Sequence, residues 1–244
     1  MNKISIFRAL IKNTVPSVNV SLADVFKVLR SEKYKNVTAE LRSKTNKVER
    51  DLWKQNKLDY ATSSGTFTKR ANAGLIQHSN YFCVDMDHVG DKDAIEAMKQ
   101  RVLKVYKPAL MFVSPSGDGL KIVYQIDTGQ ASHEQFFSAF QTFFRNEFNI
   151  EIDEKCKDVS RACFLCYDPE CFMSEAPTIM DKAFINTFSP TQPRNETPGA
   201  IINQQPIIEK WYWWTLAVIH LWGVEWWYLG NNEKSGYKKS NRKG

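Results

Sequence analysis

The chain has 244 residues, 43% of them hydrophobic and 25% charged, which is enough apolar material for one sizeable core and excludes a disordered chain. The formal charge is +6, but residues 233–244 hold five Lys or Arg against one Glu, so the rest of the chain is close to neutral. Net basicity therefore does not by itself indicate nucleic-acid binding. Basic residues interrupt the apolar ones between Met1 and Val20, so we expect no secretory signal and a cytoplasmic protein.

Helical patterns dominate the first part of the chain. Ser21 is placed to cap a helix whose apolar residues recur at helical spacing from Leu22 to Leu29. A second, charged helix is expected from Val37 to Gln55. Residues 62–67 then combine hydroxyl side chains with a glycine, which is typical of a loop.

Alternation of apolar and polar residues from Tyr81 to Asp87 predicts a strand. Its apolar residues would face the core, and Asp85 and Asp87 would project together from the opposite face. Asp91 is then expected to cap a helix that extends to about Tyr106 and covers the sheet.

A hairpin is expected next, with strands at 109–113 and 120–126 joined by a tight turn at 115–119. Ser132 and Gln135 form a capping-box pattern that opens a helix rich in phenylalanine. These phenylalanines recur at helical spacing, so we interpret them as core rather than as a base-stacking surface.

The segment from Asn149 to Asp153 alternates again and predicts a short strand that ends in a third carboxylate. The five cysteines that surround and follow these strands allow two interpretations. Cys163 and Cys166 have Cys-x-x-Cys spacing and, with Cys156 and Cys171, could form a zinc site. Alternatively, residues 161–167 form a strand in which the thiols stay free and reduced.

These acids and the expected hairpin suggest a metal and phosphate site. Two aspartates two residues apart on a strand can share a divalent cation, and carboxylate oxygens suit Mg²⁺ or Mn²⁺, although Asp-x-Asp also occurs at exposed strand ends. The turn adds hydroxyls, free backbone amides and a lysine that together could cradle a phosphate. The expected nucleotide-binding residues are Ser114, Ser116, Gly117, Gly119, Lys121 and, after Asp153, Arg161.

Three segments in this order, FCVDMDHV, SPSGDGLK and IDEKCKDVSRACFLCYDP, resemble the N-terminal domain of the virulence-associated protein E type found in bacterial mobile elements, especially in Bacteroides-like genomes. That domain in turn resembles the catalytic core of archaeo-eukaryotic primases. The resemblance covers about residues 1–174. It implies an α+β fold, a primase-polymerase-like (RRM-like) mixed sheet flanked by helices.

The same resemblance implies that Asp85, Asp87 and Asp153 are catalytic ligands for Mg²⁺ or Mn²⁺. The implied activity is a two-metal transfer of nucleotides from nucleoside triphosphates on a single-stranded DNA or RNA template, with a helicase as a further partner. Ser116 matches the serine of the second motif, whereas Lys121 stands where that motif has a histidine. A lysine binds phosphate as a point charge but cannot reproduce the directed, titratable contact of an imidazole.

Further nucleic-acid contacts are expected at Ser64, Thr66, Arg70, His88 and Asp158. His88 is open to two interpretations, since it could be a ligand or simply a solvated turn residue. Two other functions are also consistent with these residues: a binding module for nucleic acid or nucleotide that performs no turnover, and a metal-dependent nuclease or phosphotransferase.

The last part of the chain differs in composition. Residues 175–205 are rich in proline and polar residues and predict a linker, and residues 206–244 form a Trp-rich and basic tail. This tail suggests a truncated or frame-shifted product of a longer gene. A membrane-spanning helix over residues 211–229 is an alternative, but Glu225 and His220 disfavour it and favour an interfacial or poorly packed helix instead.

Overall fold

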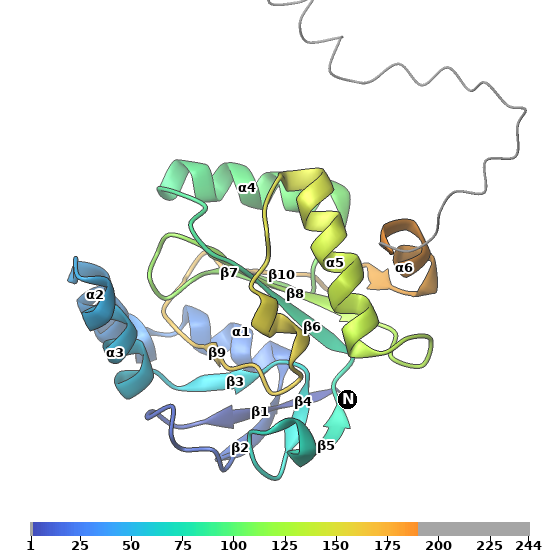
Figure 1. The fold of residues 1–244 in the computed structure, drawn as a ribbon. Coiled ribbons are helices and arrows are strands. Elements are labelled where there is room, and N and C mark those ends of the chain that lie inside the picture. The colour runs from blue at the N-terminus through green and yellow to red at the C-terminus, as the bar shows by residue number, and fades with distance from the viewer. Residues whose placement is uncertain (1, 190–244) are drawn as a thin grey trace, which may run out of the picture. The chain divides into compact units, whose positions relative to one another are not determined.

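The computed structural model describes residues 2–189, which belong to one compact unit (Figure 1). The expectations for the Trp-rich tail and for the end of the linker lie outside these residues. No helix among the described residues is both long and apolar enough to cross a membrane.

The central sheet is built around one long strand that has partners on both sides. Its strands are β6 (Tyr81–Met86), β7 (Leu110–Val113), β8 (Leu120–Ile126), β10 (Phe172–Met173) and β11 (Ile179–Met180). β8 pairs antiparallel with β6 and with β7 and parallel with β11, and β10 pairs antiparallel with β7. The structure is therefore a mixed α+β fold, as the sequence predicts at this coarser level.

Helices cover one face of this sheet (Figure 1). They are α4 (Lys92–Val105), α5 (His133–Phe148) and α6 (Lys182–Phe188). The phenylalanines of α5 are buried against the apolar face of β6 and β8, so their interpretation as core is confirmed. The helix starts at Asp91 and Ser132 are confirmed too, because each side chain accepts a backbone N–H of the first turn.

A second sheet and an amphipathic helix pack on the opposite face. The sheet has the order β2 (Val18–Ser21), β1 (Lys3–Phe7), β3 (Tyr60–Thr62) and β9 (Cys163–Phe164). The helix is α1 (Leu22–Arg30), which begins with the expected capping box at Ser21. A second apolar cluster joins these elements to β7 and β8, so the central sheet is covered on both faces.

Three peripheral elements complete the N-terminal part: α2 (Lys35–Ser43), α3 (Lys47–Lys57) and the two-stranded sheet of β4 (Gly65–Phe67) and β5 (Leu75–His78). The prediction of one helix over 37–55 is wrong, because Asn46 caps a new helix by accepting the N–H groups of Val48 and Glu49. The prediction of a loop at 62–67 is also wrong. Only Ser63 and Ser64 turn, while their neighbours gain strand partners.

Two predicted strands near the end of the domain differ from the structure. Asn149 ends α5 in the left-handed conformation, with a φ of 56°, and residues 150–153 continue without a strand partner. Ile150 and Ile152 still pack into the core. The alternating pattern of this segment therefore reflects the burial of its isoleucines and not a β-strand. The strand expected over 161–167 is confined to the two residues of β9.

The expected linker begins later than its composition suggested. Residues 179–188 form β11 and α6, and Phe184 and Ile185 of α6 are buried in the main core. The prediction of a linker is therefore wrong for this stretch, because apolar residues among the polar ones find a place beside α5 and the sheet.

Candidate active site

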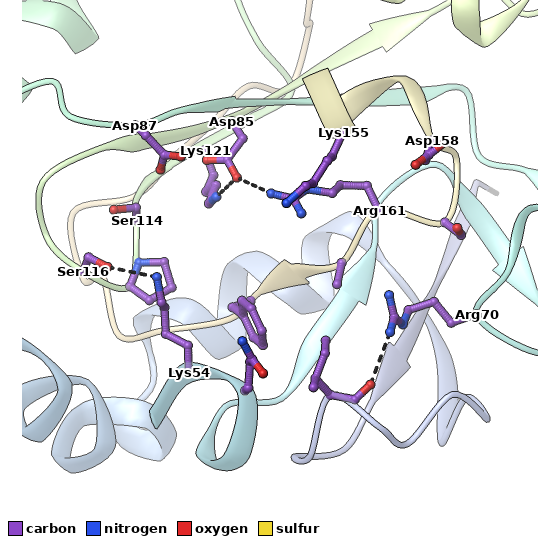
Figure 2. Close-up of a pocket in the computed structure, with 16 residues that line it drawn as sticks. Lys54, Arg70, Asp85, Asp87, Ser114, Ser116, Lys121, Lys155, Asp158 and Arg161 are labelled. Atoms are coloured by element: carbon purple, nitrogen blue, oxygen red, sulfur yellow. Dashed lines mark hydrogen bonds and ion pairs between the residues drawn. The ribbon is translucent and has the colours of Figure 1, made fainter. Parts of the chain in front are cut away.

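A cavity of about 380 Å³ opens where the end of β6, the β7–β8 hairpin and the segment after α5 meet α3 and β9 (Figure 2). Most of the residues expected to carry the chemistry line it. The polar and charged lining residues are Lys54, Gln55, Arg70, Asp85, Asp87, Ser114, Ser116, Lys121, Lys155, Asp158, Ser160 and Arg161. Among these described residues five carry a positive charge and three a negative one. The cavity therefore suits an anionic ligand.

Asp85 is the centre of a buried ion cluster. It lies opposite Lys121 in the antiparallel ladder of β6 and β8, and the two side chains form an ion pair while only 8% and 10% exposed. Arg161 binds the same carboxylate oxygen, Oδ2, at 3.3 Å. Burial lowers the pKa of Lys121, but the Asp85 carboxylate outweighs this and holds it above its ordinary value. Lys121 thus stays charged.

Three buried polar atoms of residues in the cavity wall have no partner among the described residues. They are Oδ1 of Asp85, the hydroxyl Oγ of Ser114 and Nε of Arg161. A buried polar atom without a hydrogen bond costs about 1–3 kcal/mol, so such atoms point to a ligand, ion or water that satisfies them. Of these residues, Asp85 and Ser114 each lie at the end of a strand that meets the cavity.

Asp87 follows β6 directly and points into the same space as Asp85 (Figure 2). It keeps contact with solvent, but neighbouring protein atoms remove part of its hydration. This desolvation and, next, the negative charge of Asp85 raise the pKa of Asp87 above its ordinary value. A cation between the two carboxylates would relieve this repulsion.

Asp153 lies beside these two acids, although it is far from them in the sequence. Its backbone N–H donates to the carbonyl of Asp85 at 3.4 Å, and its carboxylate Oδ2 pairs with Arg161. The other oxygen, Oδ1, accepts the N–H of Lys155 at 3.1 Å and so caps the short 3-10 helix η3 (Glu154–Lys157). The three carboxylates therefore meet at one edge of the sheet, as the sequence interpretation requires.

The hydroxyl side of the cavity is formed by the β7–β8 turn. Ser116 Oγ lies 3.5 Å from the ammonium of Lys54, which reaches across from α3 (Figure 2). Gly119 permits the close approach of the turn to β6, since a Cβ there would lie 2.4 Å from the carbonyl oxygen of Met86. Gly117 adopts a φ of 86° and faces Arg42 on α2, so it shapes the turn from outside the cavity.

Only some of the residues predicted to contact nucleic acid line the cavity. Arg70 and Asp158 line the cavity, and Arg70 is held there by the Tyr60 hydroxyl, 3.2 Å from its Nε. Ser64 borders a small void behind Asp85, and Thr66 is buried in β4 away from the cavity. His88 has a 75% exposed side chain 3.7 Å from Asp118 and lies outside the cavity lining. Its interpretation as a solvated turn residue therefore fits the geometry.

Sequence reasoning missed four polar lining residues, which are Lys54, Gln55, Lys155 and Ser160. Lys155 and Ser160 lie within the third motif segment, so proximity to Asp153 and Arg161 could have identified them. No local pattern distinguishes Lys54 from the other lysines of its charged helix. Its place follows only from the way α3 packs beside the β7–β8 turn.

The metal expectation can be tested against the donor atoms present. Within residues 2–189 no group of three or more His, Cys, Asp or Glu side chains is arranged to hold a metal ion, which covers the proposed zinc cysteines as well. All five cysteines are free. Asp85 Oδ1 and the Asp87 carboxylate nevertheless fit a divalent cation that takes its other ligands from a bound phosphate and water.

The fold and the site together define a mixed α+β domain with a charge-lined cavity at the edge of its central sheet. The family described as BT4734-like, N-terminal domain matches residues 54–173. The matched segment contains the whole ion cluster of Asp85, Lys121, Asp153 and Arg161. Comparisons with curated proteins and with solved structures find no match.

Proposed function

We propose that this domain is a primase-polymerase-like nucleotidyltransferase of a mobile-element replication protein, which joins nucleotides on a single-stranded template with the aid of Mg²⁺ or Mn²⁺. The observation that carries the proposal is the free, buried Oδ1 of Asp85 beside Asp87, which faces the hydroxyls and cations of the opposite wall across one cavity. Carboxylates on one side and phosphate-binding groups on the other suit a nucleoside triphosphate with its cation.

The order of elements supports the same proposal. β6, α4, β7, β8 and α5 follow one another as strand, helix, two strands and helix, with β8 between β6 and β7. This is the succession of a split βαβ unit, which an RRM-like sheet contains. The sequence resemblance to the virulence-associated protein E type and to primases adds to it.

Each wall of the cavity has a defined part in the proposed reaction. Lys54, Ser114 and Ser116 would bind and orient the triphosphate, because ammonium and hydroxyl groups donate to phosphate oxygens. Asp85 and Asp87 would hold the cation. When bound there, the cation would supply the positive charge that lowers the pKa of an attacking hydroxyl and stabilises a leaving pyrophosphate. Arg70 and Lys155, nearer the opposite end of the cavity, would contact the template backbone.

One observation favours a second candidate, a binding module without turnover. Lys121 and Arg161 already neutralise Asp85, and an acidic centre that is compensated by the protein's own cations needs no metal to remain stable. Such a domain would grip a nucleotide or a single strand through its cations alone. The two candidates differ in whether ligand binding and turnover require the metal.

The test is incorporation of labelled nucleotide on a primed and on an unprimed single-stranded template by the full chain, with Mg²⁺ or Mn²⁺. We expect metal-dependent products from the native chain and a loss of at least about 100-fold in Asp87→Asn, because that change removes a cation ligand. Asp93→Asn, which alters an exposed acid in the first turn of α4, is the matched control and should keep full activity.

Three other results would overturn this proposal. Nucleotide binding that survives Asp87→Asn, with no product from a well-folded native chain, would establish the binding module instead. Release of short oligonucleotides without incorporation would identify a nuclease. Equal amounts of product from the native chain and from Asp87→Asn would show that the acidic centre takes no part in the reaction.

A further inference from the structure

Three of the six carboxylate oxygens of the acidic centre, formed by Asp85, Asp87 and Asp153, already have partners from the protein itself. Oδ2 of Asp85 is bound by the ammonium of Lys121 and, at 3.3 Å, by the guanidinium of Arg161. Both oxygens of Asp153 are engaged, one by Arg161 and the other by the Lys155 N–H at 3.1 Å. Asp153 therefore acts as a helix cap and an anchor for Arg161.

The oxygens that remain lie on two residues only. Oδ1 of Asp85 is buried and has no hydrogen-bond partner in the part of the chain that the structure describes. The carboxylate of Asp87 makes no hydrogen bond or ion pair with any described residue, and it points into the same cavity. These oxygens are adjacent, and they provide one place for a cation rather than two.

The charges lead to the same number. Three carboxylates and two permanent cations leave a single net negative charge at this centre. In the absence of nucleotide, one divalent ion changes this net charge from −1 to +1, whereas two divalent ions change it to +3. A single ion therefore leaves the nucleotide-free centre nearer to balance.

We infer that this centre binds one divalent cation, on Asp87 and Oδ1 of Asp85, and that the ammonium of Lys121 occupies the place of a second one. The inference deepens the proposed nucleotidyltransferase function and rests on it only for the identity of the phosphate ligand. Lys121 supplies a fixed positive charge but cannot coordinate a hydroxyl as a metal does. Its stem is buried and its backbone is fixed opposite Asp85, so the charge stays in place.

The test is the number of Mn²⁺ ions bound per full chain, measured without nucleotide from the electron paramagnetic resonance signal of free Mn²⁺. We expect one ion in the native chain and at least tenfold weaker binding in Asp87→Asn. Lys121→Met frees Oδ2 of Asp85 from its closest cation and should bind two ions. Lys99→Met removes another buried, ion-paired lysine, which lies outside the cavity, and should still bind one.

Thermal unfolding gives a second readout in case Lys121→Met folds poorly without metal. Addition of Mn²⁺ should raise the Tm of Lys121→Met, or of the more polar Lys121→Gln, by more than that of the native chain, because the ion replaces the lost charge. An equal increase in all three proteins would overturn the inference. So would two ions, or none, in the native chain, and one ion in Lys121→Met.

This test and the incorporation assay can fail independently. A native chain that binds one Mn²⁺ in the expected manner but makes no product would contradict the proposed activity and leave the single-ion centre in place. A native chain that makes product with two bound ions would do the reverse.

Discussion

Lys121 lies directly opposite Asp85 in the ladder between β8 and β6, and its ammonium is paired with the Asp85 carboxylate inside the protein. The pair therefore joins the two strands through their side chains as well as through their backbones. Arg161 extends the link to Asp153, so the strand pair is tied to the segment that follows α5. One ion cluster thus connects three segments of the domain and shapes the site.

Loss of Lys121 should destabilise the domain strongly. We expect Lys121→Met to lower the free energy of unfolding by about 3 kcal/mol in the absence of metal, because it leaves a buried carboxylate short of a counter-charge. The measurement is urea unfolding followed by circular dichroism in the presence of a chelator. Lys99→Met is the control, since its partner Glu96 is 54% exposed and the pair contributes about 1 kcal/mol or less. Equal losses in the two variants would contradict the prediction.

Two histidines connect the β4–β5 sheet to η3 and thus to the acidic centre. The backbone N–H of Asn80 donates to Nδ1 of His78 at 3.0 Å, so the proton of His78 must be on Nε2. That Nε2–H donates to Nδ1 of His133 at 3.2 Å, and Nε2–H of His133 donates to the carbonyl of Cys156 at 3.1 Å. Every ring nitrogen of this relay, formed by His78 and His133, takes part in a hydrogen bond. This pattern of donors and acceptors requires both rings to be neutral.

Acid should therefore destabilise the domain through His78. Burial, followed by the neighbouring His133, lowers the pKa of His78 to about 4 from an ordinary value near 6.5. A depressed histidine pKa favours the folded state at pH values above 6.5, and this contribution is lost as pH falls from 6.5 through 4. We expect a loss of at most about 3 kcal/mol across this window. His78→Gln should flatten the dependence of urea unfolding on pH.

His88→Gln provides the matched control for that change. The His88 side chain is 75% exposed and lies outside the relay, so the acid dependence should equal that of the native chain. If both substitutions left the same slope between pH 6.5 and 4, the relay would not be its source.

Gly119 is required by the close approach of the hairpin to the end of β6. A Cβ at this position would lie 2.4 Å from the Met86 carbonyl oxygen and 3.2 Å from the Cα of Asp87. Gly119→Ala should cost about 2 kcal/mol of unfolding free energy, because backbone atoms must separate to admit the methyl group. It should also weaken Mn²⁺ binding, since Asp87 moves. Gly129→Ala is the control and should change neither quantity measurably, because there the nearest atom is a side-chain oxygen of Asp127.

Local sequence patterns were sufficient for the elements that carry the acids. The alternation of residues 81–87 placed Asp85 and Asp87 on one face, and hairpin chemistry placed Ser114 and Ser116 beside them. The same period-two pattern failed at 149–153, because an extended segment that packs its isoleucines without a strand partner has the same alternation as a strand.

Contacts between side chains that are far apart in the sequence could not be predicted from local patterns. The sequence offered Lys121 as a phosphate ligand, whereas the register of β6 and β8 places it against Asp85. Lys54 lies 62 positions before Ser116, and the two side chains meet only because α3 packs beside the turn. Register and helix packing depend on the complete core, and a local window does not contain them.

A substitution of Lys155 can show whether the backbone of a single-stranded nucleic acid binds along the cavity. It lines the cavity at the start of η3, whereas Lys157, two residues later, is paired with Glu154 at 3.7 Å and lies outside the lining. Each phosphate contact to a single strand adds about 0.7 to the magnitude of the slope of log K against log salt concentration. Lys155→Ala should therefore reduce that slope by about 0.7 for a single-stranded oligonucleotide, measured by fluorescence anisotropy. Lys157→Ala should leave it unchanged, and an equal reduction in both would indicate general charge attraction without a defined path.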